Sequence, residues 1–166
     1  IIKKIIFIIF TITFVVEVNA EEVKKMGTHK DWETYIINSD TGRVCFAQSK
    51  PVLQSPKNSP RKARLFISFR PGEKITNEIS VTAGYEFNNK NSVIAQSGKN
   101  KYKLDLIQDG FAWMTGTKLE IKMIKTMKRG SRIMITGNTQ TGSSTIDHYS
   151  LLGFTKAYNA TKANCS

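Results

Sequence analysis

The sequence has few of the residues on which most enzyme active sites depend. Only two histidines and two cysteines occur among its 166 residues, which limits any Ser-His-Asp arrangement or zinc site. The motifs G-x-S-x-G, G-x-x-x-x-G-K-[ST], G-x-G-x-x-G, H-x-x-x-H and C-x-x-C are all absent. We therefore predict no catalytic motif, no metal site and no cofactor, and a non-enzymatic function is favoured.

Long apolar runs are also scarce, and the one at the N-terminus is organised like a secretory signal. Lys3 and Lys4 precede an apolar stretch over residues 5–16, and a short segment that ends at Ala20 follows. We expect a signal peptide over 1–20 and a single domain over 21–166, either periplasmic or secreted, with outer-membrane association as a further option. An uncleaved anchor helix is the alternative, although a bilayer span needs about 20 apolar residues.

Acidic residues are few compared with basic ones. The chain has 13 Asp and Glu against 25 Lys and Arg, a net charge of +12. A basic exported protein meets lipid headgroups and lipopolysaccharide phosphates rather than nucleic acid. We therefore expect an anionic envelope lipid, lipopolysaccharide or an envelope protein as partner, with peripheral membrane contact and no nucleic acid. The heavy use of lysine, isoleucine and asparagine leaves open the alternative that the charge reflects composition alone.

The two cysteines, Cys45 and Cys165, are expected to form a disulfide bond, because exported chains fold in an oxidising compartment. Closing so long a loop stabilises a fold by about 4–5 kcal/mol in the chain-entropy description. Two unpaired thiols or an intermolecular bond are the alternatives.

The apolar pattern predicts a mainly β domain, an antiparallel β-sandwich or a barrel-like sheet. Many short alternating runs are separated by turns that contain Gly, Pro or Asn. One helix is predicted over about 118–129, and a short C-terminal helix over about 155–163 with Thr155 as its N-cap. The polar segment 21–30 is expected to fray.

The helix predicted at 118–129 has a capping box and two distinct faces. Thr117 and Glu120 have the spacing of the capping box. The apolar stripe consists of Leu119, Met123, Ile124 and Met127. The opposite face is a basic ridge of Lys118, Lys122, Lys125 and Arg129. This ridge is the candidate binding site for an anionic surface, and a merely solvated charged face is the alternative.

Asp147 falls on the inward face of an alternating strand over 144–152. A carboxylate buried without a partner would cost several kcal/mol, so we predict a buried structural ion pair with Arg70 or Arg132. The competing hypothesis is an envelope hydrolase or carbohydrate-processing enzyme that uses Asp147 or a glutamate. The glutamates considered are Glu73, Glu78 and Glu86.

The large aromatic residues are expected in the core rather than on a ligand platform. They are Trp32, Tyr85, Trp113, Tyr149 and Phe154.

Several short motifs, spread over nearly all of residues 21–166, support one resemblance. They are Trp32 followed by Cys45, Arg70-Pro71-Gly72-Glu73, Asn77-Glu78-Ile79-Ser80, Gly84-Tyr85, Ala112-Trp113, Asp147, Tyr149-Ser150-Leu151, Gly153-Phe154, Ala157 and Cys165. Together they resemble the invasion-associated locus B (IalB) family of exported alphaproteobacterial envelope proteins. The resemblance implies an envelope protein, associated in some pathogens with entry into host cells, and it brings no catalytic residues.

Overall fold

Two antiparallel sheets form most of the computed structural model, which describes residues 21–166. The expected signal peptide, 1–20, lies outside the described residues. The first sheet has seven strands in the order β1 (Glu22–His29), β2 (Trp32–Ser39), β3 (Gly42–Ser49), β5 (Arg64–Arg70), β6 (Ile75–Thr82), β10 (Phe111–Trp113) and β9 (Leu106–Gln108). The second has five in the order β4 (Leu53–Ser55), β12 (Ser144–Ser150), β11 (Arg132–Asn138), β7 (Val93–Ser97) and β8 (Asn100–Leu104).

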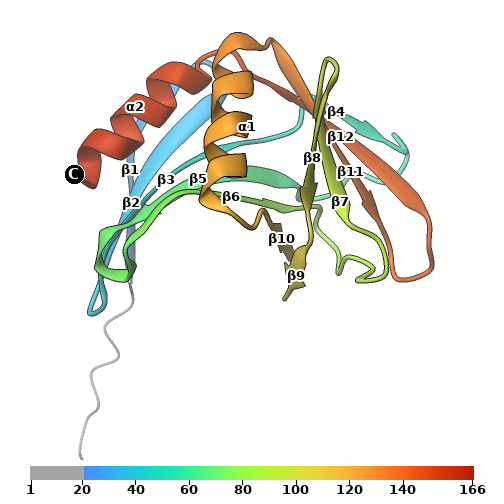
Figure 1. Cartoon of the computed structure of the whole chain (residues 1–166), viewed down its shortest axis with the longest axis horizontal. Helices are drawn as coiled ribbons and strands as arrows, with labels where there is room; N and C mark the ends of the chain where they lie inside the picture. The colour runs from blue at the N-terminus through green and yellow to red at the C-terminus, as the bar shows by residue number, and fades with distance from the viewer. Residues whose placement is uncertain (1–20) are drawn as a thin grey trace, which may run out of the picture.

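Both helices lie over the same side of the seven-stranded sheet (Figure 1). Helix α2 (Phe154–Asn164) contacts β2 and β3, and α1 (Thr117–Arg129) contacts β6 and also β8 of the second sheet. A short 3-10 turn, η1 (Pro71–Glu73), links β5 to β6. Within residues 21–166 the sheets do not close into a barrel, so the mainly β, sandwich-like prediction is confirmed.

The core forms where alternating strand residues meet the helices. Strand β2 buries Trp32, Thr34 and Ile36 and turns the residues between them to the opposite face. Trp32 is 0% exposed, and its ring lies edge-on to that of Phe154 with the centroids 4.9 Å apart. Its indole N–H donates to the Ser150 carbonyl at 3.0 Å. Residues from the first core strand, the last strand and the last helix therefore share one buried contact.

The expectation that residues 21–30 fray is wrong. They form β1, which pairs with β2 from Glu22 to His29 with one irregularity between Lys25 and Gly27. As an edge strand, β1 is held by backbone hydrogen bonds while most of its side chains stay exposed. The segment therefore lacks the alternating apolar pattern by which a strand is recognised.

Helix α2 begins one residue earlier than predicted, and Gly153 rather than Thr155 is its N-cap. Gly153 has φ 87°, and a Cβ there would lie 1.8 Å from the His29 carbonyl oxygen. The turn before α2 therefore packs against the end of β1 so closely that only glycine fits.

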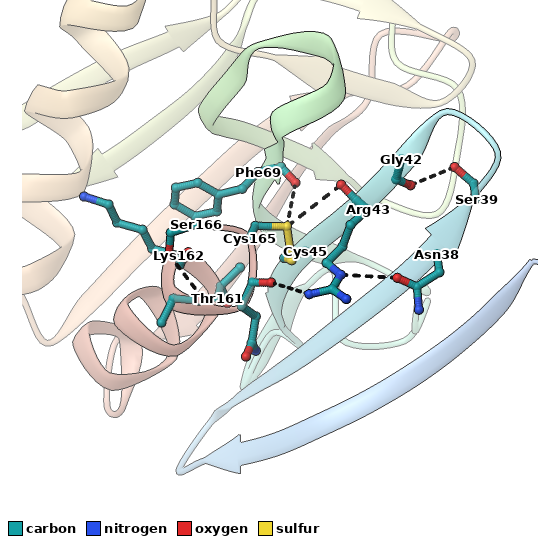
Figure 2. Close-up of a disulfide and its surroundings, with 12 residues drawn as sticks. Asn38, Ser39, Gly42, Arg43, Cys45, Phe69, Thr161, Lys162, Cys165 and Ser166 are labelled. Carbon is teal, nitrogen blue, oxygen red and sulfur yellow. Dashed lines mark hydrogen bonds between the residues drawn. A yellow bond between two sulfur atoms is a disulfide. The ribbon is translucent and has the colours of Figure 1, made fainter.

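The predicted bond between Cys45 and Cys165 is confirmed, and it joins β3 to the end of α2 across a sequence separation of 120 (Figure 2). Their Cα atoms are 5.9 Å apart. The Arg43 guanidinium reinforces the junction by donating from Nη1 to the Asn164 carbonyl at 3.2 Å. Figure 2 also shows the Cys165 sulfur against the Phe69 carbonyl, so the helix end sits on both β3 and β5.

Helix α1 confirms the predicted helix but not its cap. Gly116 is the N-cap and makes no side-chain capping bond, so the capping box of Thr117 and Glu120 does not form. Leu119, assigned to the buried stripe, is 51% exposed, and Glu120 lies on the buried face instead, at 8% exposure. The buried stripe is thus displaced by one residue at the start of the helix.

Candidate functional site

A groove between α1 and the neighbouring edge of the five-stranded sheet collects basic side chains from three parts of the chain. Its volume is about 710 Å³. Helix α1 supplies one wall, the turn between β7 and β8 the second, and the start of β11 the third. We call it the cationic groove, and its basic residues are Lys99, Lys122, Lys125, Arg129 and Arg132.

The walls of the cationic groove are fixed by hydrogen bonds beneath the charged side chains. The Tyr102 and Thr126 hydroxyls are 2.6 Å apart, which ties β8 to α1. The Ser97 hydroxyl donates to the Arg132 carbonyl at 2.8 Å and joins β7 to β11. At Gly130, where α1 ends, a Cβ would lie 3.0 Å from the Ser97 oxygen. Helix end and sheet therefore meet closely under the groove.

The charge of the groove is not neutralised by the rest of the described chain. All five basic residues are exposed, and none of the ion pairs within residues 21–166 involves them. No carboxylate lines the groove. By contrast, Arg70 pairs with Glu78 and Arg61 pairs with Asp147. Unpaired guanidinium and ammonium groups on three walls suit a phosphate or a similar polyanion.

The structure brings together three of the four residues of the predicted basic ridge. Lys122, Lys125 and Arg129 line the groove, whereas Lys118 does not. Lys99 and Arg132 are the additions, and they come from other elements. Helical spacing predicts that Lys122, Lys125 and Arg129 share a face. No pattern in the sequence links a lysine in a turn or an arginine at the start of a strand to this helix.

Asp147 is buried in an ion pair, but its partner is Arg61 rather than Arg70 or Arg132. The carboxylate is 2% and the guanidinium side chain 9% exposed. Gln54 donates to Asp147 Oδ1 at 2.9 Å, and its own side-chain oxygen accepts from the Arg61 backbone N–H at 3.0 Å. Burial raises the pKa of Asp147, while the bonds from Gln54 and Arg61 act in the opposite direction. These contacts hold β4 and the segment that follows it against β12, so the role of Asp147 in this arrangement is structural.

The two arginines predicted for Asp147 lie elsewhere. Arg70 donates to Glu78 at 2.7 Å and lies 3.3 Å from Glu73, and Arg132 lines the cationic groove. Arg61 follows a proline-containing segment, and it lies near β12 because β4 pairs with that strand. No local pattern in the sequence indicates this pairing, so the sequence did not identify Arg61.

A second pocket lies between the N-terminal end of α1 and strands β6, β9 and β10. That end of α1 is the lower one in Figure 1. Its volume is about 420 Å³. We call it the sheet–helix pocket, and its polar and aromatic lining includes Arg70, Lys74, Glu78, Gln108, Trp113 and Glu120. The sequence patterns identify Glu78 as a candidate site carboxylate but not Glu120.

One aromatic residue expected in the core and one carboxylate that the sequence did not single out as a site residue line this pocket. Trp32, Tyr149 and Phe154 are buried as predicted, but Trp113 and Tyr85 are only half-buried. On β10, Trp113 follows the buried Ala112, and it lines the sheet–helix pocket. Glu120 has a signal in the sequence, since it lies between the positions of the helical apolar stripe.

Both carboxyl groups in the pocket titrate above their ordinary range. Burial is the main cause of the raised pKa of Glu120; the negative charge of Glu78 adds to it, and a backbone hydrogen bond at Ile79 opposes it. Burial also raises the pKa of Glu78, against the pull of Arg70. In the folded protein both groups therefore hold a proton more tightly than in the unfolded chain.

This shift predicts a pH-dependent effect of Glu120→Gln on stability. As pH rises from the ordinary value of 4.5 through the raised pKa, the folded wild-type chain retains a proton that the unfolded chain has released, so wild-type stability falls. Glutamine cannot ionise. We expect the free energy of unfolding of the variant, relative to wild type, to increase over this window and to level off above it. Urea unfolding at a series of pH values measures the difference, and a pH-independent difference would contradict the assignment.

Two further observations concern the described residues as a whole. Across residues 21–166, no three His, Cys, Asp or Glu side chains are grouped as metal ligands. Neither helix in that range is long and apolar enough to cross a membrane.

Residues 32–162 match the family described as Invasion associated locus B (IalB) protein. The chain belongs to the IalB family. The match extends over most of the described residues and confirms the resemblance read from the short motifs. The IalB match contains the whole cationic groove, the sheet–helix pocket, Cys45 and Asp147, while β1 and Cys165 lie beyond it. No curated protein and no solved structure matches this IalB chain.

Proposed function

We propose that this IalB protein is an exported, non-enzymatic binding module of the cell envelope that holds phosphate groups of an anionic surface lipid in its cationic groove. The observation that carries the proposal is the convergence of five exposed basic side chains, from three elements, with no carboxylate among them. A net charge of +12 adds a long-range attraction to the same kind of surface.

Two features support an envelope location. The segment 1–20 has the sequence organisation of a secretory signal. The bond between Cys45 and Cys165 suits an oxidising compartment such as the periplasm or the cell exterior. A phosphate-bearing component of the envelope, such as lipopolysaccharide, is the polyanion that an exported protein would meet there.

Exposed apolar side chains beside the groove favour a lipid over a free polyanion. Leu119 and Ile121 are 51% and 40% exposed. At 100° per residue they flank the ridge of Lys122, Lys125 and Arg129 on either side. Basic side chains set between apolar ones are typical of a surface that contacts headgroups and the shallow apolar layer below them. This arrangement supports peripheral contact rather than insertion.

Charge reversal in the groove tests the proposal. We expect Lys122→Glu, Lys125→Glu and Arg129→Glu together to weaken binding to vesicles that contain anionic lipid or lipopolysaccharide by roughly a hundredfold, since each basic residue near such a surface contributes about 1 kcal/mol. Vesicle co-sedimentation at low and high salt gives the affinities, and wild-type binding should fall steeply with salt.

The matched control carries the same change in net charge away from the groove, at the exposed residues Lys24, Lys57 and Lys90. It should retain most of the wild-type affinity. Equal weakening by both triple variants would mean that net charge alone drives association, and salt-independent binding by the wild type would overturn the proposal.

A further inference from the structure

Glu120 is the feature that sets the sheet–helix pocket apart from the rest of the surface. Its side chain lines the pocket although the residue is only 8% exposed. Within residues 21–166 it forms no ion pair, and no side chain donates a hydrogen bond to it. The backbone of Ile79 is the one polar group that lowers the pKa of its carboxyl group. A carboxyl group has two oxygens that can each accept more than one hydrogen bond. Acceptor capacity is thus left facing the pocket.

The charges around the pocket balance. Arg70 and Lys74 face Glu78 and Glu120, and Arg70 is already engaged by Glu78 and Glu73. A strongly cationic or strongly anionic ligand would therefore meet groups of its own sign at close range. A neutral ligand would not, and it would have both donors and acceptors available in the same pocket. Hydroxyl groups use both, because each one donates and accepts.

The remaining lining supplies a flat apolar surface. Trp113 and Leu106 lie on neighbouring strands in direct register, and both line the pocket. The Trp113 ring stacks on Phe111 at 5.5 Å with an interplanar angle of 29°, which holds it in place from one side. An indole of this kind offers an amphipathic contact, with an apolar face and a polar edge. The volume of about 420 Å³ lies in the range usual for ligand sites.

We propose that the sheet–helix pocket binds a neutral carbohydrate segment of one or two sugar rings, with Trp113 against the apolar face of a ring and Glu120, Glu78 and Gln108 on its hydroxyl groups. Such a ligand matches an unfilled carboxyl group, balanced charge and an indole platform together. The site shares no lining residue with the cationic groove, and it is independent of the proposed lipid binding.

The tryptophans provide the readout. The chain has two, and Trp32 is 0% exposed, so a change in indole emission on adding sugar reports on Trp113. Maltotetraose, cellotetraose and chitotetraose are the probes. Each is titrated into the protein, and binding is followed by tryptophan fluorescence and by calorimetry. We expect at least one of them to bind with a change in emission that is absent in Trp113→Phe.

Glu120→Gln keeps the shape of the side chain and is expected to weaken binding about tenfold or more, because hydrogen bonds to a charged acceptor are the stronger ones. Glu86→Gln, a change at an exposed glutamate outside the pocket, is the control and should bind like wild type. Absence of binding by all three sugars overturns the proposal, and so does binding that Glu120→Gln leaves unchanged. Binding of anionic vesicles by Glu120→Gln should equal that of wild type, which separates this site from the groove.

Discussion

Replacing both Cys45 and Cys165 by alanine is expected to lower the free energy of unfolding by about 4–5 kcal/mol, because the bond closes a loop of 120 residues in the unfolded chain. This is the largest effect we expect from any paired substitution. Cys45 is fully buried, so the double alanine variant also loses packing at β3. Urea unfolding of wild type and variant, followed by circular dichroism, measures the difference.

The native contacts around the bond indicate how the variant should behave. In the wild type, Tyr158 donates to Asn77 at 2.6 Å and its ring packs on Phe69 with the centroids 5.7 Å apart, and neither contact uses a cysteine. We therefore expect α2 to remain docked at low denaturant and to unfold with the rest of the domain. Reductant should destabilise the wild type and leave the variant unaffected. A loss below about 1 kcal/mol would contradict the chain-entropy argument.

Replacing Arg61 by methionine is expected to cost about 3–5 kcal/mol at neutral pH, because it leaves the Asp147 carboxylate buried without a counter-charge. Methionine keeps an unbranched stem of similar length, so the lost charge rather than lost volume dominates. Thermal or urea unfolding gives the value.

The pH dependence and a double-mutant cycle isolate the charge. Burial already raises the pKa of Asp147, and loss of Arg61 raises it further. The difference between Arg61→Met and wild type should therefore be largest above that raised pKa and should shrink as pH falls through it, because the protonated carboxyl needs no partner. Asp147→Asn combined with Arg61→Met should recover much of the stability. A difference that stays constant from acid to neutral pH would show that packing, not charge, is responsible.

The sequence predicts those features that depend on local periodicity or on composition. The alternation of β2, the apolar stripe of α1 and the pairing of two cysteines all follow from residue type and spacing, and the structure agrees with each in outline. Helical spacing likewise predicts that Lys122, Lys125 and Arg129 form a ridge on one face of α1.

Features that depend on where distant segments meet were not predictable in this way. Lys99 and Arg132 join the groove only because two sheet strands end beside α1, and Arg61 reaches Asp147 only after β4 pairs with β12. Strand β1 has no apolar alternation because its side chains face water. Glu120 is the exception, since a carboxylate on a predicted apolar face is itself a signal of a polar cavity.

The buried contact between Trp32 and Phe154 has a consequence for biogenesis. Synthesis from the N-terminus delivers β2 long before α2. Until Phe154 arrives, the indole of Trp32 has no cover on its helix side, and Cys45 has no Cys165 with which to react. Native closure must therefore follow synthesis of nearly all of residues 21–166, and until then the early hairpins expose apolar surface that favours aggregation.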